Sequence, residues 1–324
     1  MSGKLVLRSK VQIDDMEIGD SLNESDWSTL TEKGNFVQFE YVPEDNKRVN
    51  IASPGIYNLI QTNMGMFLEE TQFTADDILK DFVNTKDTME KIDKFFESID
   101  KYKKYGRFAK RGALFYGPAG TGKTTTIAEA SRKYSQDGET FILLWHTSQI
   151  EAGDVKYFLK NLEYDPKVKK MILVAEDIGG IEIDQARIRS ESDLLSLLDN
   201  QEQTFKVPVY IAATTNYPEN FMGNLTNRPN RFDDKIRVGY PSADAREALM
   251  KFYDKDGLAD ESSYTLLKSD KCKEFTPAHI CEIIIRSDIY GQSVTTTINQ
   301  ILEEIATYNR GFSEKGKRFG LLED

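Results

Sequence analysis

The chain has 324 residues, of which 39% are hydrophobic and 29% charged, with a formal net charge of −11. This length predicts more than one compact unit, because single domains usually hold about 100 to 200 residues. The longest apolar runs fall far short of the roughly 20 residues that cross a bilayer, so we expect no transmembrane segment. The negative charge repels a phosphate backbone and argues against sequence-independent nucleic-acid binding, although a local basic groove stays open.

The start of the chain and the two cysteines indicate the compartment. Residues Met1 to Val11 include basic side chains but no apolar stretch typical of a secretory signal. Cys272 and Cys281 are too few to form a disulfide framework for a chain of this size. The expected compartment is the cytoplasm. The one basic stretch, Lys101 to Arg111, is interpreted as a solvated helix end that leads into a strand.

Residues 1–70 differ from the rest of the chain. Glycine, asparagine and proline punctuate short alternating runs, such as the segment from Phe36 to Val42. This pattern predicts a small β-containing N-terminal domain that binds a substrate or partner. From Thr74 onward the apolar residues recur every three to four positions, which is typical of helices.

Four apolar runs follow, separated by helical stretches. This alternation predicts a parallel sheet built from right-handed βαβ units, with helices on both faces and ligands at the carboxyl ends of the strands. A fifth strand is expected near residues 235–238. The four runs are Gly112 to Tyr116, Thr140 to Trp145, Met171 to Ala175 and Val207 to Ala213.

After Pro241 the pattern becomes helical again. The predicted helices are Ala243 to Lys255, Pro277 to Tyr290 and Val294 to Asn309. The expected fold class is therefore α/β, with a C-terminal helical lid and the small N-terminal domain. The expected domains are residues 1–70, an α/β core at 71–241, the lid at 242–310 and a tail at 311–324.

The sequence GPAGTGKT, from Gly117 to Thr124, follows an apolar strand and opens a helix. Glycines let backbone N–H groups turn toward phosphate oxygens, Lys123 adds a cation for the β and γ phosphates, and the Thr124 hydroxyl suits Mg²⁺. The full GxxxxGK[ST] pattern in this context predicts a site for ATP and Mg²⁺. The residues expected to bind the nucleotide are Gly117, Pro118, Ala119, Gly120, Thr121, Gly122, Lys123, Thr124 and Thr125.

The third apolar run ends in Glu176 and Asp177, where P-loop ATPases place acids next to the γ phosphate. Adjacent carboxylates at the end of a buried strand repel each other unless a cation compensates. One acid is expected to hold Mg²⁺ through water, and the other to orient and deprotonate the attacking water. The position of each residue assigns Glu176 to the metal and Asp177 to the water.

Two further elements complete the predicted catalytic set. Asn216 follows the fourth strand, where an amide can reach between the γ phosphate and the water, or can simply form a turn. Arg228 and Arg231 lie one turn apart in NRPNRFDDKI. Clustered guanidiniums need anions, which are either the γ phosphate of a neighbouring subunit or the carboxylates of Asp233 or Asp234.

Together, GPAGTGKT, ILVAED, ATTN and RPNRFD resemble the ordered motif set of the AAA subfamily of AAA+ ATPases, over roughly residues 75 to 290. In that family these segments are Walker A, Walker B, sensor 1 and the arginine-finger region. The resemblance implies a homo-oligomeric ring, mostly a hexamer, that hydrolyses ATP to remodel proteins. It does not indicate the protein client.

The order Glu176 then Asp177 inverts the usual end of Walker B. The same inversion is typical of the branch of the mitochondrial translocase that inserts the Rieske protein, and LLSLLD and FTPAHI also resemble that branch. Within FTPAHI, Ala278 replaces a sensor 2 arginine. That translocase carries an N-terminal membrane helix with no counterpart here, so we do not expect a membrane role.

The loop after the second strand reads TSQIEAGDVKYF, without an aromatic residue before Gly153 at the spacing that unfoldases use to grip polypeptide. Tyr157 and Phe158 are expected to pack a helix into the core. Remodelling of a folded or loosely held partner is thus favoured over processive unfolding. His146 and His279 have no cysteine at zinc-ligand spacing, so both are expected to be structural and no metal beyond Mg²⁺ is predicted.

Two alternatives remain beside the remodelling ATPase. One is a DNA-handling AAA+ machine of the clamp-loader or helicase-loader type, which the acidic charge disfavours. The other is a nucleotide-gated assembly protein with little turnover, suggested by the short side chain of Asp177. A small-molecule kinase is disfavoured, because it has no use for a trans arginine pair or for the helical lid.

Overall fold

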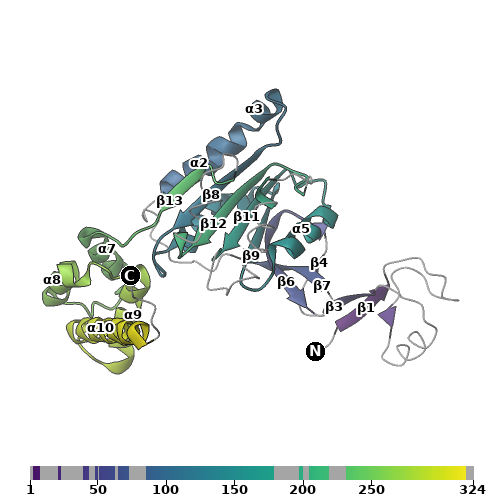
Figure 1. The fold of residues 1–324 in the computed structure, drawn as a ribbon. Helices are drawn as coiled ribbons and strands as arrows, with labels where there is room; N and C mark the ends of the chain where they lie inside the picture. The colour runs from purple at the N-terminus through teal and green to yellow at the C-terminus, as the bar shows by residue number, and fades with distance from the viewer. Residues whose placement is uncertain are drawn as a thin grey trace.

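The computed structural model describes residues 3–7, 21–22, 39–43, 48–49, 51–62, 65–72, 85–178, 197–199, 204–218 and 231–318. Within these residues the chain forms a large sheet covered by helices, a C-terminal helical unit and a small N-terminal sheet (Figure 1). The expected α/β class is confirmed.

The large sheet has eight strands, and its neighbours pair in parallel from β13 through β6 before two antiparallel strands close the edge. The five strands expected from the apolar runs are all present. In spatial order the strands are β13 (Asp234–Arg237), β8 (Lys110–Tyr116), β12 (Val209–Thr215), β11 (Lys170–Glu176), β9 (Thr140–His146), β6 (Gly55–Thr62), β7 (Gly65–Thr71) and β4 (Arg48–Val49).

The sheet extends into the region expected to be a separate N-terminal domain. Strand β6 pairs in parallel with β9, and β7 folds back against β6. Since Ile56 and Leu59 are buried on opposite faces of the sheet, β6 is apolar on both sides, as an interior strand requires. The expected boundary at residue 70 therefore falls inside a continuous sheet.

Two smaller sheets lie beside the large one. The first is antiparallel and joins β1 (Gly3–Leu7) to β2 (Ser21–Leu22) and β3 (Phe39–Pro43). The second pairs β5 (Ile51–Ala52) with β10 (Glu163–Tyr164) in parallel. The N-terminal part of the chain thus contains β structure, as its alternating sequence indicates.

Successive side chains of the large sheet enter two different cores. Along β11, Met171, Leu173 and Ala175 face one core, whereas Ile172 and Val174 face the other. This period of two is the ordinary alternation of a strand, and burial on both faces explains the continuous apolar runs. The sheet is therefore the middle layer of three.

Helices cover both faces. Helices α2 (Thr85–Glu97) and α4 (Lys123–Ser131) pack against one face through buried residues such as Phe95 and Ile127. Helix α5 (Ala152–Asn161) packs against the other face. The short helices α3 (Ile99–Lys104) and η2 (Arg132–Gln136) follow α2 and α4. No helix formed by the described residues is long and apolar enough to cross a membrane.

The C-terminal unit has its own core of residues such as Leu249, Phe275 and Ile298. It comprises α7 (Ala243–Tyr253), α8 (Glu261–Lys268), η4 (Asp270–Cys272), α9 (Pro277–Tyr290) and α10 (Val294–Arg318). The expected α7 and α9 are confirmed, α10 is longer than expected, and the sequence pattern did not single out α8. We call this unit the lid.

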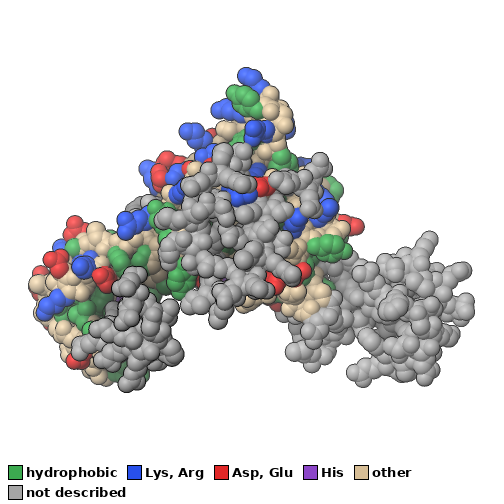
Figure 2. Space-filling view, in the orientation of Figure 1, with side chains coloured by type: hydrophobic (Ala, Val, Ile, Leu, Met, Phe, Trp, Pro, Cys, Tyr) green, Lys and Arg blue, Asp and Glu red, His purple; other side chains and the backbone are tan. Residues whose placement is uncertain are grey.

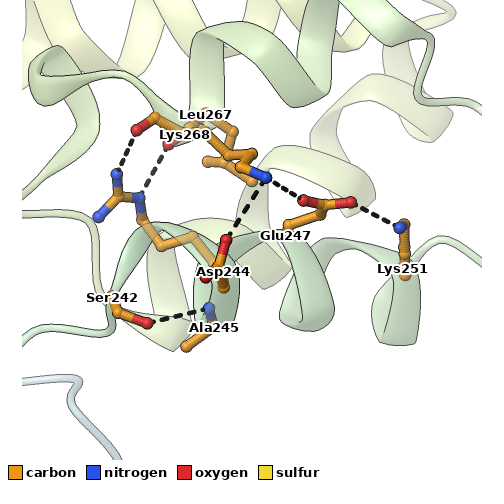
Figure 3. Close-up of polar contacts among 8 residues, drawn as sticks. Ser242, Asp244, Ala245, Glu247, Lys251, Leu267 and Lys268 are labelled. Carbon is orange, nitrogen blue, oxygen red and sulfur yellow. Dashed lines mark hydrogen bonds and ion pairs between the residues drawn. The ribbon is translucent and has the colours of Figure 1, made fainter.

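Polar contacts of Arg246 and Lys268 join α7 and α8, the first two helices of the lid. The guanidinium of Arg246, on α7, donates to the carbonyls of Leu267, Lys268 and Ser269 at the end of α8, and to that of Pro241. These bonds satisfy carbonyls that the last turn of a helix leaves without partners. Lys268 lies between Asp244 and Glu247 beside this contact (Figure 3).

Candidate functional site

The turn between β8 and α4 has a conformation that requires glycine. Gly117 has φ 150°, and a Cβ added there would lie 2.0 Å from the Val238 carbonyl oxygen. Gly122 precedes α4 with φ 87°, in the left-handed region. The first N–H groups of a helix have no partners within it and carry partial positive charge, so this turn is suited to bind an anion.

Lys123 opens α4 and is buried beneath the turn. Its Nζ donates to the carbonyl oxygens of Gly117 and Pro118, at 2.8 Å each, and to Oδ1 of Asn216 at 2.6 Å. Burial lowers the pKa of Lys123, and the nearby charge of Asp177 opposes that shift. The ammonium is therefore fixed at the turn that was expected to hold the phosphates.

Asn216 links that lysine to the acidic strand end. Its Nδ2 donates to Oδ1 of Asp177 at 2.9 Å, while its Oδ1 accepts from Lys123. These three residues come from the ends of three elements that are adjacent in the sheet, namely β11, β12 and the β8–α4 turn. The fold thus brings Lys123, Asn216 and Asp177 together, as the sequence predicted for a single site.

Asp177 has φ 56°, and it is the one non-glycine residue with positive φ among the described positions. Its N–H donates to Oγ1 of Thr214 at 2.9 Å, and the Thr147 hydroxyl donates to its carbonyl at 3.0 Å. Residues other than glycine rarely adopt a positive φ. The resulting backbone strain persists where surrounding hydrogen bonds hold the backbone in place, often at functional sites. The carboxylate is exposed although its backbone is held.

Glu176, which precedes Asp177, contacts a residue that was not predicted to belong to the site. Nδ1 of His146 lies 2.7 Å from Oε2 of Glu176. The two residues stand opposite each other where β9 and β11 end, since their Cα atoms are register partners. His146 therefore belongs to the site, whereas it was expected to be only structural. The signal available in the sequence was that His146 directly follows an apolar run, just as Glu176 does.

The oxygen atoms near this strand edge suit a hard cation such as Mg²⁺, which prefers carboxylate and hydroxyl oxygens and keeps several waters and phosphates as ligands. Glu176 and Thr124 offer those two kinds of oxygen. Among the described residues no three His, Cys, Asp or Glu side chains form a metal-binding group. The donor set fits a metal that the nucleotide helps to hold.

The lid reaches the phosphate turn through the start of α9. A Cβ added at Gly120 would lie 3.0 Å from Oγ1 of Thr276 and 3.3 Å from Cβ of Ala278. Thr276 caps α9, and His279 completes this cap by accepting the Thr276 N–H. His279 is thus structural, as expected, and Ala278 brings no charge to the turn.

Arg231 lies elsewhere than expected. It is only 4% exposed, and its Nε and a terminal nitrogen each donate to Asp199 of the same chain at 3.0 Å. This guanidinium is therefore paired and desolvated within its own chain. Its carboxylate partner is neither of the two expected, Asp233 and Asp234. Arg228 lies outside the described residues.

The two aromatic residues of α5 divide between surface and core. Phe158 packs against the core, as expected, but Tyr157 is 71% exposed. The reason is helical geometry, because the buried stripe of α5 passes through Val155 and Leu159 and leaves residue 157 on the opposite side. The expectation that both aromatics pack inward is wrong for Tyr157.

Comparisons with known proteins also find similarity to ATPases. Residues 113–240 match the family model described as "ATPase family associated with various cellular activities (AAA)". The chain is 30% identical over 205 residues to the ATP-dependent zinc metalloprotease FtsH of Lancefieldella parvula, covering 58% of this chain and 30% of that protein.

Two plant proteins are similar over a longer part of the chain. It is 27% identical over 239 residues to AAA-ATPase At2g18193 of Arabidopsis thaliana, covering 70% of this chain and 46% of that protein. It is 28% identical over 261 residues to AAA-ATPase At4g30250 of the same plant, covering 71% and 49%. The chain thus spans less than half the length of each of these relatives.

Proposed function

We propose that this chain, of which residues 113–240 match the AAA ATPase family model, binds ATP with Mg²⁺ and hydrolyses it in a homo-oligomeric ring that remodels protein partners. The observation that carries the proposal is the hydrogen-bonded series Lys123–Asn216–Asp177 at the carboxyl edge of the sheet. A cation, an amide and a carboxylate at this edge are the groups that phosphoryl transfer requires.

Each residue then has a distinct task. The β8–α4 turn and Lys123 bind the triphosphate, and Thr124 with Glu176 would hold Mg²⁺, which neutralises charge on the β and γ phosphates. Asp177 orients the attacking water and accepts its proton, within reach of the Asn216 amide. His146 fixes the carboxylate of Glu176 by direct contact.

We propose that Arg228 completes the site of the adjacent subunit. Phosphoryl transfer spreads charge over the γ-phosphate oxygens, and an arginine supplied in trans stabilises that charge. Arg231 has a different role in this proposal, because it is paired with Asp199 of its own chain. A hexamer is the ring size that the resemblance implies.

The branch and the compartment are also proposals. The order Glu176 then Asp177 supports a relation to the branch of the Rieske-protein translocase. Cys272 and Cys281 are both free thiols, which fits a reducing compartment such as the cytoplasm.

Two variants test the chemical part of the proposal. Lys123→Ala removes the cation beneath the phosphates, so binding of a fluorescent ATP analogue is expected to weaken at least about tenfold. Asp177→Asn keeps the shape of the side chain but accepts no proton, so it is expected to bind ATP normally and release phosphate at least about a hundredfold more slowly.

The same steady-state phosphate-release assay separates the alternatives. Phosphate release by Asp177→Asn at the unaltered rate would exclude Asp177 as the base. A wild-type protein that binds ATP but releases phosphate no faster than a reaction without protein would instead be a nucleotide-gated assembly protein.

A further inference from the structure

The described surface includes one projecting basic and aromatic tip, at residues 101–108. It comprises the end of α3 and the turn that leads into β8, and it forms an apex of the molecule where Lys and Arg side chains surround an apolar one (Figures 1 and 2). Tyr105 is 74% exposed and Phe108 is 41% exposed. We call these residues the α3 tip.

The α3 tip is held firmly from below. Tyr102 packs edge-on against Phe95 of α2, with ring centroids 5.7 Å apart, and Ile99 packs against the same core. Gly106, with φ 62°, lets the chain reverse after the helix. The exposed aromatics therefore stand on an anchored base.

The cations at the tip have little to neutralise them. Lys103 is paired with Asp100 at 3.1 Å, but within the part of the chain that the structure describes, Lys101, Lys104 and Arg107 form no ion pair. All three are exposed, on a chain whose net charge is −11. An unneutralised local excess of positive charge on an acidic protein attracts anions to that one place.

The tip is separate from the nucleotide site. It precedes the first residue of β8, whereas the phosphate turn follows the last, and a strand of this length spans about 20 Å. That separation exceeds the screening length of about 8 Å at physiological salt, so the tip has no direct electrostatic role at the phosphates.

We propose that the α3 tip binds acidic segments, interspersed with apolar residues, of the proteins on which this chain acts. This inference rests on the proposed remodelling function and names the class of partner. Glu or Asp side chains pair with Lys101, Lys104 and Arg107, and an apolar side chain packs against Tyr105 or Phe108. Aromatic and arginine side chains are the usual anchors of protein interfaces.

The size and charge of the tip favour such a segment over other polyanions. A nucleic acid strand longer than a few nucleotides would extend beyond the tip along a chain whose net charge is −11, which repels a phosphate backbone overall. A lipid surface is bound by amphipathic helices with a broad apolar face, which α3, at six residues, does not provide. A short acidic peptide needs neither an extended basic surface nor a broad apolar face.

The test uses the full-length wild-type protein and a fluorescent peptide of repeated Glu-Glu-Leu, followed by anisotropy without nucleotide. The triple variant K101E/K104E/R107E is expected to weaken peptide binding by about tenfold or more, since three exposed attractions become repulsions. The control K271E/K273E makes the same kind of change at two exposed lid lysines and is expected to bind as the wild type does.

Two further measurements separate the electrostatic contribution to peptide binding from the apolar contribution. A peptide of repeated Gln-Gln-Leu is expected not to bind, and Tyr105→Ser with Phe108→Ser is expected to weaken binding of the acidic peptide while keeping its salt dependence. Unaltered binding by the triple variant would overturn the proposal, as would tip-dependent binding of a single-stranded oligonucleotide or of phosphatidylserine vesicles that is tighter than peptide binding.

Because no nucleotide is present, the result is independent of ATP hydrolysis. Lys123→Ala is expected to bind the peptide as the wild type does, and loss of peptide binding in that variant would contradict a separate site.

Discussion

At the scale of single residues, the site depends on Asn216 as the shared partner of a cation and an anion. Its Oδ1 accepts from Lys123 and its Nδ2 donates to Asp177, so one amide orients both. The orientation of an Asn amide follows from which partners can donate, and here only the lysine can. Asn216 therefore fixes the distance between the phosphate-binding cation and the proposed base.

Asn216→Ala is expected to lower turnover by roughly a hundredfold while changing ATP affinity less than about tenfold, because loss of one positioned polar group acts mainly on the transition state. Phosphate release and binding of a fluorescent ATP analogue measure the two effects. Asn161→Ala, which removes an exposed amide on α5, is the matched control and is expected to leave both unchanged. Equal turnover in the two variants would remove Asn216 from the mechanism.

Sequence patterns identified the residues of this site but not all of their contacts. The glycine-rich turn and the acids at the end of a strand are local signals, and the carboxyl ends of neighbouring parallel strands necessarily meet at one edge. The contact between His146 and Glu176 depends on which strand lies next to β11 and in what register, and a single run of residues does not encode that choice.

At the scale of secondary-structure elements, the pair Asp199–Arg231 ties two separate segments together. Residues 197–199 are helical, and Arg231 stands just before β13. Lys110 lies close by, and burial lowers its pKa while Asp199 and Asp233 oppose that shift. This edge of the sheet thus contains a compact group of opposite charges.

Asp199→Ala is expected to reduce the free energy of unfolding by about 3 kcal/mol, because it leaves a buried guanidinium without its bidentate partner. Chemical denaturation measures the change. Asp100→Ala removes the carboxylate of an exposed ion pair and is expected to cost less than about 1 kcal/mol. Equal stability of the two variants would mean that Arg231 is compensated by other groups.

Elements with strong periodicity were predictable, and those that depend on distant pairing were not. The strands of the core and helix α9 follow directly from apolar patterns. The extension of the sheet by β6 and β7 was not expected, because a strand's sequence does not reveal which neighbour it pairs with. Within α5, the sequence likewise did not reveal which of two adjacent aromatics faces the core: Phe158 packs inward and Tyr157 is exposed.

At the scale of the whole molecule, the proposed nucleotide site at one edge of the sheet lies against the lid and, in the proposed ring, next to another subunit. The start of α9 lies against Gly120 of the phosphate turn, so a change at the phosphates has a direct steric route to the lid. The α3 tip lies at the opposite end of β8, where a partner is held apart from the chemistry. We propose that, in such a ring, each site becomes active only with Arg228 of the next subunit.

Mixing two inactive variants tests that claim most directly. Arg228→Ala has an intact phosphate site without its finger, and Asp177→Asn has the finger but no base, so each is expected to release phosphate at least about a hundredfold more slowly than the wild type. When the two are co-assembled, a subunit with Arg228 stands beside an intact phosphate site, and steady-state phosphate release is expected to recover in proportion to such neighbours. No recovery in verified mixed assemblies, or full turnover by Arg228→Ala alone, would contradict the account.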